Sequence, residues 1–360
     1  MKLGVFITLT LSCQNNNQMN EKFEWGETIS CPPGYPVDVY RGGLQSVDGG
    51  FTSLYLGTHS GIEGWGSEGR SMSDGKKTVP NHLHVIWLSY AEDCFYEVDT
   101  DIDYEKMVKL FKQGYYTPSS SASRPEPFKE KYNRIIVGFA PGGTVVVWLA
   151  GVGRQIEIGS YQGKKATIPQ DQIDQLDYPI KNIFDPEYRK NILKNPGIVP
   201  KEIQEENKTQ PIPFGLWDSY RKKYNWKASF KLPDNGISKK IIFYYYNGER
   251  EILFGQSEIN KYVDIPSELK WNNLKKPPIP KELKISWLNN NILYVGEIAF
   301  NEKEIFSAFE EVFREHPEGK AELIIRVNNA QDDASILLSG NGKEIWIKDS
   351  VIEIFDTSKY

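Results

Sequence analysis

The sequence predicts an α+β protein made of two tandem related units, each an antiparallel sheet with one main helix packed on it. The chain has 360 residues, which is about two domains of ordinary size. Residues 80–88 read PNHLHVIWL and residues 280–288 read PKELKISWL, so Pro, Leu, Trp and Leu recur in register. In both halves a second strand, a capped helix and a strand hairpin then follow in the same order, which indicates a repeated unit.

The first half contains alternating segments that are typical of half-buried strands. We expect strands at YPVDVY, FTSLYLG, PNHLHVIWL and CFYEVD. Asp103 is a good N-cap for the helix that follows, because its side-chain oxygen can accept an orphaned backbone N–H. That helix would turn Met107, Leu110 and Phe111 inward. A hairpin over Arg134 to Gly151, turning at PGG, completes the unit.

The second half repeats this order with different residues. WKASFKLP is matched to YPVDVY, and KIIFYYYNG to FTSLYLG. After ILYVGEIAF, Asn301 caps a helix that turns Ile305, Phe306, Phe309 and Phe313 inward. A hairpin over Ala321 to Gly340 follows. We therefore divide the chain into a lipoprotein signal and polar tether (1–21), a first unit (22–160), a partly helical connector (161–215) and a second unit (216–360).

The N-terminal residues indicate that the protein is located at a bacterial envelope. Lys2 is followed by nine apolar or small residues, then Ser12, Cys13 and the polar run QNNNQMNEK. This order is typical of a short secretory signal. The segment around Cys13 resembles the lipobox of bacterial lipoproteins, which implies a lipid on Cys13 and a membrane-anchored protein facing the periplasm. The alternative is a buried first strand, which would rarely run into so polar a tract.

Composition excludes several classes of protein. Charged residues make up 25% and apolar residues 39% of the chain, so disorder as a whole is excluded. The net charge of −5 argues against nucleic acid as a partner. With Cys13 lipidated, Cys31 and Cys94 remain, either as a disulfide or as two unrelated thiols.

The sequence offers candidate chemistry, but each candidate has a simpler interpretation. DTDID (99–103) begins like a calcium loop, yet Tyr104 stands where that loop needs Gly and Leu110 where it needs Glu. We therefore expect a solvated face that ends in the helix cap. His82 and His84 would share one strand face, opposite Leu83, Val85 and Trp87, and be exposed. No catalytic constellation is recognised, so we expect no enzyme, no metal and no cofactor.

A glycine-rich loop supplies the best candidate for binding. Trp65 and Arg70 lie in GIEGWGSEGRSMSDGKK, and Trp and Arg are favoured anchors in binding sites. Packing of Trp65 against its own sheet is the alternative. The charged residues Arg41, Asp48, Glu92 and Asp93 complete the candidate binding set. Tyr244, Tyr245, Tyr246, Trp217 and Trp226 form a second aromatic group in the other half. Aromatic surfaces suit sugars or protein partners.

Three blocks of the first half carry a resemblance to a known family. They are GYPVDVYRGGL (34–44), GWGSEGRSMSDGKK (64–77) and WLSYAEDCFYEVDTDIDYEKMVKLFKQGY (87–115). They resemble an uncharacterised bacterial family of predicted lipoproteins, catalogued as a domain of unknown function. The resemblance implies an envelope lipoprotein and transfers no site residues.

These observations favour a lipid-anchored envelope protein that binds a protein partner. A specific version is an immunity-type inhibitor of a toxin that acts at the envelope, since many toxins are basic and complementary charge speeds capture. The alternatives are a glycan-binding or envelope-maintenance module that uses Trp65 and the Tyr244 surface, and a hydrolase that uses the carboxylates between Glu92 and Asp103.

Overall fold

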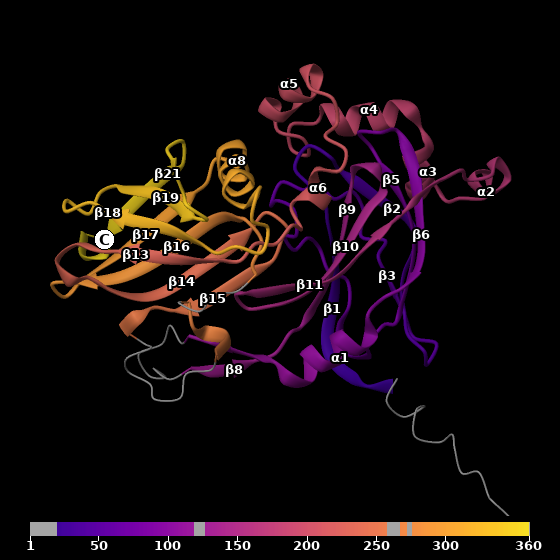
Figure 1. The fold of residues 1–360 in the computed structure, drawn as a ribbon. Coiled ribbons are helices and arrows are strands. Elements are labelled where there is room, and N and C mark those ends of the chain that lie inside the picture. The colour runs from indigo at the N-terminus through magenta and orange to yellow at the C-terminus, as the bar shows by residue number, and fades with distance from the viewer. Residues whose placement is uncertain (1–19, 119–126, 258–266, 272–275, 360) are drawn as a thin grey trace, which may run out of the picture.

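A computed structural model describes residues 20–118, 127–257, 267–271 and 276–359. Cys13 and the signal lie outside these residues, so the lipidation site stays a prediction. Strands dominate, with several helices, and the fold is α+β as the sequence predicts. The strands form sheets of ten, five, four and two strands. Figure 1 shows the two halves of the chain side by side, with a group of short helices above the first.

The elements follow the chain in three groups. The first unit contains β1 (Lys22–Ser30), β2 (Val37–Gln45), β3 (Phe51–Ser53), β4 (Asp74–Thr78), β5 (His82–Ser89), β6 (Cys94–Asp101), α1 (Tyr104–Gln113), β7 (Tyr115–Thr117), β8 (Phe128–Glu130), β9 (Arg134–Ala140), β10 (Thr144–Gly151), β11 (Arg154–Gln162) and β12 (Lys164–Ala166). The connector contains α2 (Gln170–Asp174), α3 (Tyr178–Lys181), α4 (Pro186–Lys194) and α5 (Lys201–Thr209). The second unit contains α6 (Leu216–Ser219), β13 (Trp226–Lys231), β14 (Ile237–Tyr245), β15 (Arg250–Phe254), β16 (Pro280–Asn289), β17 (Ile292–Ala299), α8 (Glu302–Phe313), β18 (Ala321–Val327), β19 (Ala334–Gly340), β20 (Lys343–Ile347) and β21 (Val351–Asp356).

The two halves have the same order of paired strands. In the first, the orders are β12-β6-β5-β2-β3 and β11-β10-β9-β1. In the second they are β21-β17-β16-β14-β15 and β20-β19-β18-β13. β1 pairs with β9, and β13 with β18, in parallel. The sheets are otherwise built from antiparallel pairs, and these two pairs differ because a strand that returns after a long crossover can pair in parallel. Origin by duplication stays a prediction.

The strand order also corrects how the halves were matched. β13, which contains WKASFK, takes the place of β1 and not of YPVDVY. β14 takes the place of β2, so the match is displaced by one strand. The error arose because KFEWGETIS (22–30) was not recognised as a strand, although all its residues from Trp25 to Ser30 are buried. A fully buried strand lacks the alternation by which strands are found.

The core of each unit lies between two sheets, so each unit has two sheets where one was predicted. In the first unit, Ile29 and Val147 of the ten-stranded sheet share a buried cluster with Val39 and Trp87 of the five-stranded sheet. In the second, inner residues of β14, β16 and β17 meet β18, β19 and the apolar face of α8. Asp103 and Asn301 cap α1 and α8 as predicted, accepting from Lys106 N and Glu304 N.

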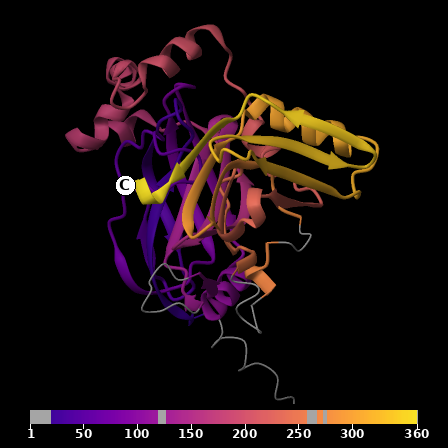
Figure 2. The ribbon, with the colours of Figure 1, turned by 90° about the vertical axis from the view of Figure 1, so that its left-hand side faces the viewer.

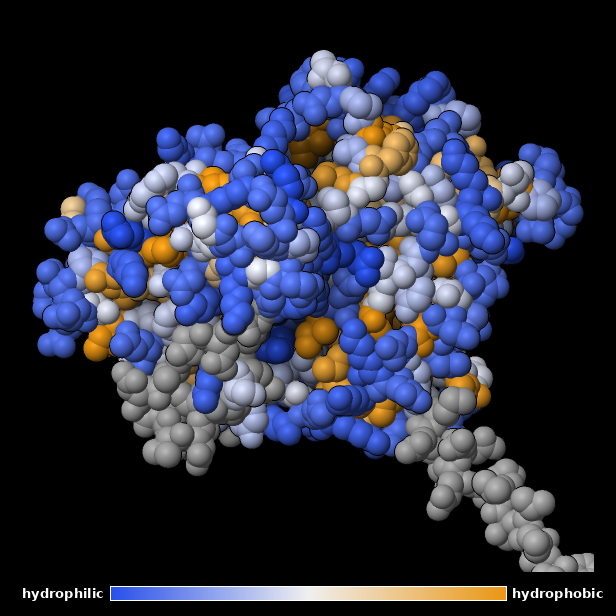
Figure 3. All heavy atoms as spheres, viewed as in Figure 1, coloured by the Kyte–Doolittle hydropathy of each residue, from blue (hydrophilic) through white to orange (hydrophobic). Residues whose placement is uncertain are grey.

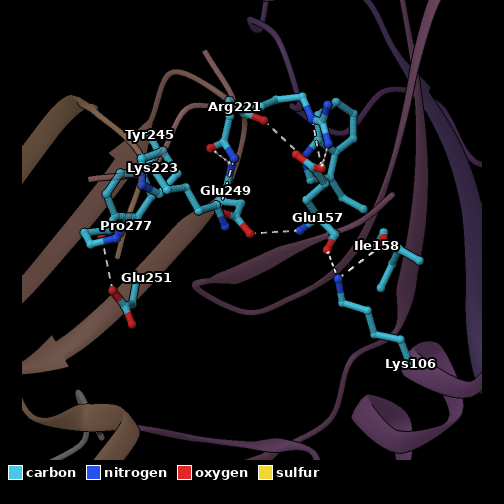
Figure 4. A network of polar contacts seen from close by, with 12 residues as sticks. Lys106, Glu157, Ile158, Arg221, Lys223, Tyr245, Glu249, Glu251 and Pro277 are labelled. Carbon is cyan, nitrogen blue, oxygen red and sulfur yellow. Dashed lines mark hydrogen bonds and ion pairs between the residues drawn. The ribbon is translucent and has the colours of Figure 1, made fainter. Parts of the chain in front are cut away.

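One sheet runs through both units. β11 pairs with β15 at a single position, Gln155 opposite Arg250, which joins five strands of each unit into the ten-stranded sheet. Charged groups reinforce this junction (Figure 4): Glu157 of β11 accepts hydrogen bonds from Arg221, and its backbone N–H donates to Glu249 Oε1 at 3.1 Å. Lys106 Nζ of α1 donates to the carbonyl oxygen of Glu157 at 2.8 Å. The two units therefore share an extensive polar contact.

The connector covers part of the outer face of the five-stranded sheet. Tyr40, Leu88 and Phe95 point outward from this sheet and form a buried cluster with Ile168 and Ile183 of the connector. Figure 2 shows the connector helices as a group beside and above the first unit. β12, which falls within the predicted connector, pairs with β6 in the five-stranded sheet.

Candidate functional site

The structure separates the predicted binding set into three regions. Arg41 and Asp93 lie at the connector: Arg41 Nη1 donates to Gln172 Oε1 at 3.5 Å, and Asp93 accepts from Arg189. Asp48 lies in a tight turn, where Thr78 Oγ1 donates to its Oδ2 at 2.5 Å. The hydrogen bond from Thr78 has the largest effect on the pKa of this carboxyl, and it lowers that pKa.

Trp65 lies in the junction between the units. Its ring meets Trp148 edge-on, with centroids 4.9 Å apart, and it contacts the buried cluster of Ile136 and Val146. Arg70 is exposed on the same loop, and its charge together with burial lowers the pKa of His59 to about 4, burial contributing most. Trp65 therefore packs against its own sheet, as the alternative interpretation has it, and a binding role for its half-buried ring stays a prediction. In the second aromatic group, Trp217, Trp226, Tyr245 and Tyr246 are buried and Tyr244 is half-buried.

Asp99 and Asp101 of the acidic run lie at the end of β6, beside the histidines of β5. His82 bridges two carboxylates, with Nε2 2.6 Å from Asp99 Oδ1 and Nδ1 2.8 Å from Asp101 Oδ1. These hydrogen bonds, the one to Asp101 most, raise the pKa of His82. His84 Nε2 lies 2.8 Å from Glu97 Oε1. Among the described residues, no group of three or more His, Cys, Asp or Glu side chains is placed to hold a metal ion.

The two described cysteines are not bonded to each other. Cys31 is buried, and its thiol donates to the carbonyl oxygen of His59 at 3.4 Å. Burial raises the pKa of Cys31, and burial together with the Glu92 charge raises that of Cys94. Of the two alternatives that the sequence left open, the structure has two separate thiols. Neither thiol is activated as a nucleophile, since thiolate formation is disfavoured at both.

Glu92 has a structural position. Its carboxylate accepts from the backbone N–H of Gly142 at 3.2 Å, from Tyr96 Oη at 2.7 Å and from Ser89 Oγ at 2.8 Å. These bonds tie the turn after β5 to the turn between β9 and β10. The neighbouring Asp93 lies in the turn between β5 and β6 and has a positive φ of 50°.

One hollow of the described surface lies between β6, β12 and the connector, and we name it the Arg189 hollow. Its volume is about 570 Å³. The residues that line it are Asp93, Cys94, Phe95, Ala166, Thr167, Ile168, Gln170, Ile173, Lys181, Phe184, Asp185 and Arg189. Phe95 and Phe184 stack with centroids 4.9 Å apart and form an apolar floor. This volume and this mixture of aromatic and polar groups are typical of a binding site.

Arg189 organises the rim of this hollow. Its Nη1 donates to Asp93 Oδ1 at 2.6 Å, its Nε donates to the carbonyl oxygen of Ile183 at 2.6 Å, and its guanidinium lies 5.2 Å from the Phe95 ring centroid. The Arg189 side chain is 13% exposed, whereas that of Asp93 is 70% exposed. The arginine therefore holds a carboxylate in place while leaving it open to a partner.

A second hollow, of about 330 Å³, lies between α4 and α5, and we name it the lysine groove. Its lining residues are Tyr35, Ala91, Lys190, Leu193, Lys194, Val199, Gln204, Asn207, Lys208, Gln210 and Ile212. Figure 3 shows apolar side chains recessed among hydrophilic ones in this part of the surface.

Sequence reasoning missed Arg189, Phe184 and the lysine groove. Arg189 lies in a helix of the connector, which was predicted to be partly helical, but its contact with Phe95 crosses 94 residues of chain and has no local signal. The lysine groove could have been predicted in part from the spacing of two lysines. Lys190 and Lys194 are four residues apart in one helix, so they share a face.

Comparison with known proteins identifies the family. The family described as "Protein of unknown function (DUF2931)" matches residues 12–215, more than half of the chain. The protein therefore belongs to this family. The match covers the first unit and the connector, and thus both hollows. No curated protein matches the chain, and no solved structure matches it. None of the described helices is long and apolar enough to cross a membrane.

Proposed function

We propose that this is a lipid-anchored protein of the bacterial envelope that binds a protein partner at the Arg189 hollow. The specific role that we propose is an immunity-type inhibitor of a toxin that acts at the envelope. One observation carries the proposal: an exposed carboxylate, Asp93, is held by a mostly buried arginine at the rim of an aromatic-floored hollow.

The chemistry of the hollow suits a basic side chain of a partner. Asp93 and Asp185 offer carboxylates at the rim, and the stacked Phe95 and Phe184 rings offer an apolar floor. A lysine or arginine can bury its aliphatic stem on such a floor while its charge meets the carboxylates. The net charge of −5 would also speed the approach of a basic protein.

The placement of the hollow supports the proposed anchor. The described chain starts beside α1, where Glu21 Oε1 accepts from Lys112 Nζ at 2.5 Å. In Figures 1 and 2 this end of the first unit lies opposite the connector helices. A lipid on Cys13 would therefore hold the protein by one end and present the connector to the periplasm.

The two alternative functions receive less support. A glycan site at Trp65 would need an open ring face, but this side chain is half-buried against Trp148. A hydrolase would need the carboxylates Glu97, Asp99 and Asp101 around a cleft, but they follow an exposed sheet face and are paired with histidines. We therefore propose the protein partner alone.

Competition between isogenic strains tests the immunity role. A strain without this gene, and without its own toxin, is grown in contact with its parent. We expect the parent to overgrow it, and the wild-type gene to restore its survival. Asp93→Lys, which reverses the exposed rim charge, should fail to restore survival. Asp171→Lys changes an exposed acid of α2 that does not line the hollow, so it should restore survival. Equal survival of the deleted strain and the parent would contradict the proposal.

Lipidation is tested separately. Cys13→Ser should move the protein from the membrane fraction to the soluble fraction and remove the acyl mass from the mature chain. Several acyl chains on one residue give stable anchoring, since each buried methylene contributes about 0.8 kcal/mol. A protein that stays in the membrane fraction with an unchanged mass would overturn the anchor.

A further inference from the structure

We infer that the lysine groove between α4 and α5 binds a dispersed anionic amphiphile, a fatty-acid carboxylate, with its chain on the apolar floor and its carboxylate at Lys194. This goes beyond the proposed protein partner and uses a different hollow.

The floor of the groove is apolar and firmly built. Val199 is 1% exposed, and the half-buried side chains of Tyr35, Leu193 and Ile212 lie around it. α5 can approach the first unit closely because residue 34 is glycine. A Cβ there would lie 2.5 Å from Ile203 Cγ2, and Gly34 has a φ of +84°. The floor is therefore formed by both the first unit and the connector.

Every charged residue that lines the groove is a lysine, in a chain whose acids outnumber its bases. Lys190 and Lys208 are paired with Glu187 and Glu205 of their own helices, at 2.7 and 2.6 Å. Lys194 has no ion pair within the part of the chain that the structure describes. This cation next to an apolar floor is complementary to a ligand with an anionic head and an apolar chain.

Negative charge near the groove limits how the ligand can lie. The Glu206 charge, after burial, contributes to raising the pKa of Tyr35 at the floor, so this side of the groove would repel a carboxylate. The head group is therefore directed to Lys194, at the C-terminal end of α4. With the chain anchored at Cys13, as proposed above, the groove faces away from the bilayer. The expected ligand is therefore a dispersed fatty acid and not a membrane surface.

Calorimetric titration with saturated fatty acids tests the inference. The full chain is used as the Cys13→Ser variant, so that no acyl chain of its own competes, and the ligands are octanoate, decanoate and dodecanoate below their micelle concentrations. Each added methylene that enters the groove should tighten binding about fourfold. Dodecanol, which lacks the charge, should bind at least about tenfold more weakly than dodecanoate.

Matched variants separate the roles of charge and floor. Lys194→Gln should weaken dodecanoate binding at least about fivefold and leave dodecanol unchanged. Lys201→Gln removes a lysine of α5 that does not line the groove, so it should change neither ligand. Ile212→Asp should abolish binding of both. The inference is overturned if no fatty acid binds, if dodecanol binds as tightly as dodecanoate, or if Lys194→Gln and Lys201→Gln behave alike. Binding to anionic vesicles without binding to dispersed dodecanoate would overturn it too.

Discussion

Glu157 and Arg221 join the first unit to the chain that enters the second. Glu157 Oε1 accepts from Nε of Arg221 at 2.9 Å and from Nη2 at 2.6 Å, so one carboxylate oxygen carries both bonds. The other oxygen, Oε2, is buried without a hydrogen-bond partner among the described groups. The arginine is therefore the main compensation for this buried charge, and the hydrogen bonds that it donates to Glu157 raise the pKa of Arg221.

Arg221→Met should destabilise the protein by about 2 kcal/mol, because it leaves the carboxylate of Glu157 buried without its cation. The cost falls below that of a fully buried pair, since the Arg221 side chain is 35% exposed. Urea unfolding followed by circular dichroism measures the change. The control is Lys276→Met, which breaks a surface pair with Glu318 and should cost less than about 0.5 kcal/mol. Equal losses in the two variants would contradict a special role for the junction pair.

Gly66→Ala should cost more than Gly49→Ala, although both glycines have nearly the same backbone. Their φ values are +80° and +82°. A Cβ at residue 49 meets nothing within 4 Å, so only the backbone strain of about 1 kcal/mol is expected there. A Cβ at residue 66 lies 2.6 Å from Gly248 Cα, and we expect about 3 kcal/mol in total. The difference between the two variants in the free energy of unfolding measures the effect of the contact between the units. A difference near zero would show that the backbone at the junction moves to accommodate the added methyl group.

Asp38 should make the protein less stable as pH rises from about 4 to 6. This carboxyl is 4% exposed, and burial raises its pKa to about 6 against the hydrogen bonds from Thr58 and Tyr90. The folded state then binds more protons than the unfolded state in this range, so unfolding free energy falls as pH rises, and the loss persists at pH 7. Asp38→Asn should remove this slope and raise stability at pH 7 by about 2 kcal/mol. Urea unfolding between pH 4 and 7.5 measures it.

Asp48→Asn should change the stability at neutral pH in the opposite direction, and it serves as the control. The hydrogen bond from Thr78 lowers the pKa of Asp48, so its ionised form stabilises the folded state at neutral pH. The substitution should therefore reduce stability at pH 7 and leave it unchanged at low pH. If Asp38→Asn lowered stability at pH 7 as well, Asp38 would be ionised and satisfied in the folded state.

Local rules predicted the features that neighbouring residues determine. Alternation placed Leu83 and Trp87 inward and His82 outward, and the structure confirms this because the pleat alone decides the face of each residue. The helix caps Asp103 and Asn301 were found in the same way, since a cap acts on backbone groups two or three residues away.

Contacts between segments that are distant in the sequence determine the features that local rules did not predict. The parallel pairing of β1 and β9 brings together strands about a hundred residues apart, and no local pattern specifies it. Trp65 has the residue type of a binding anchor, but its surroundings come from Trp148 and from the backbone at Gly138, both distant in the sequence. For the candidate site, Asp93 was named from the sequence, whereas the arginine that positions it was not.

The family match ends at residue 215, but the packing does not. The Trp148 indole N–H donates to the carbonyl oxygen of Asn247 at 3.1 Å, and Ile136, Val146 and Ala150 lie buried beside that indole. A fragment cut after residue 215 would lack the chain around Asn247 and would expose these apolar side chains to water. Such a fragment would be prone to self-association, so proteolytic trimming to the family boundary would yield an aggregating species and not a smaller working protein.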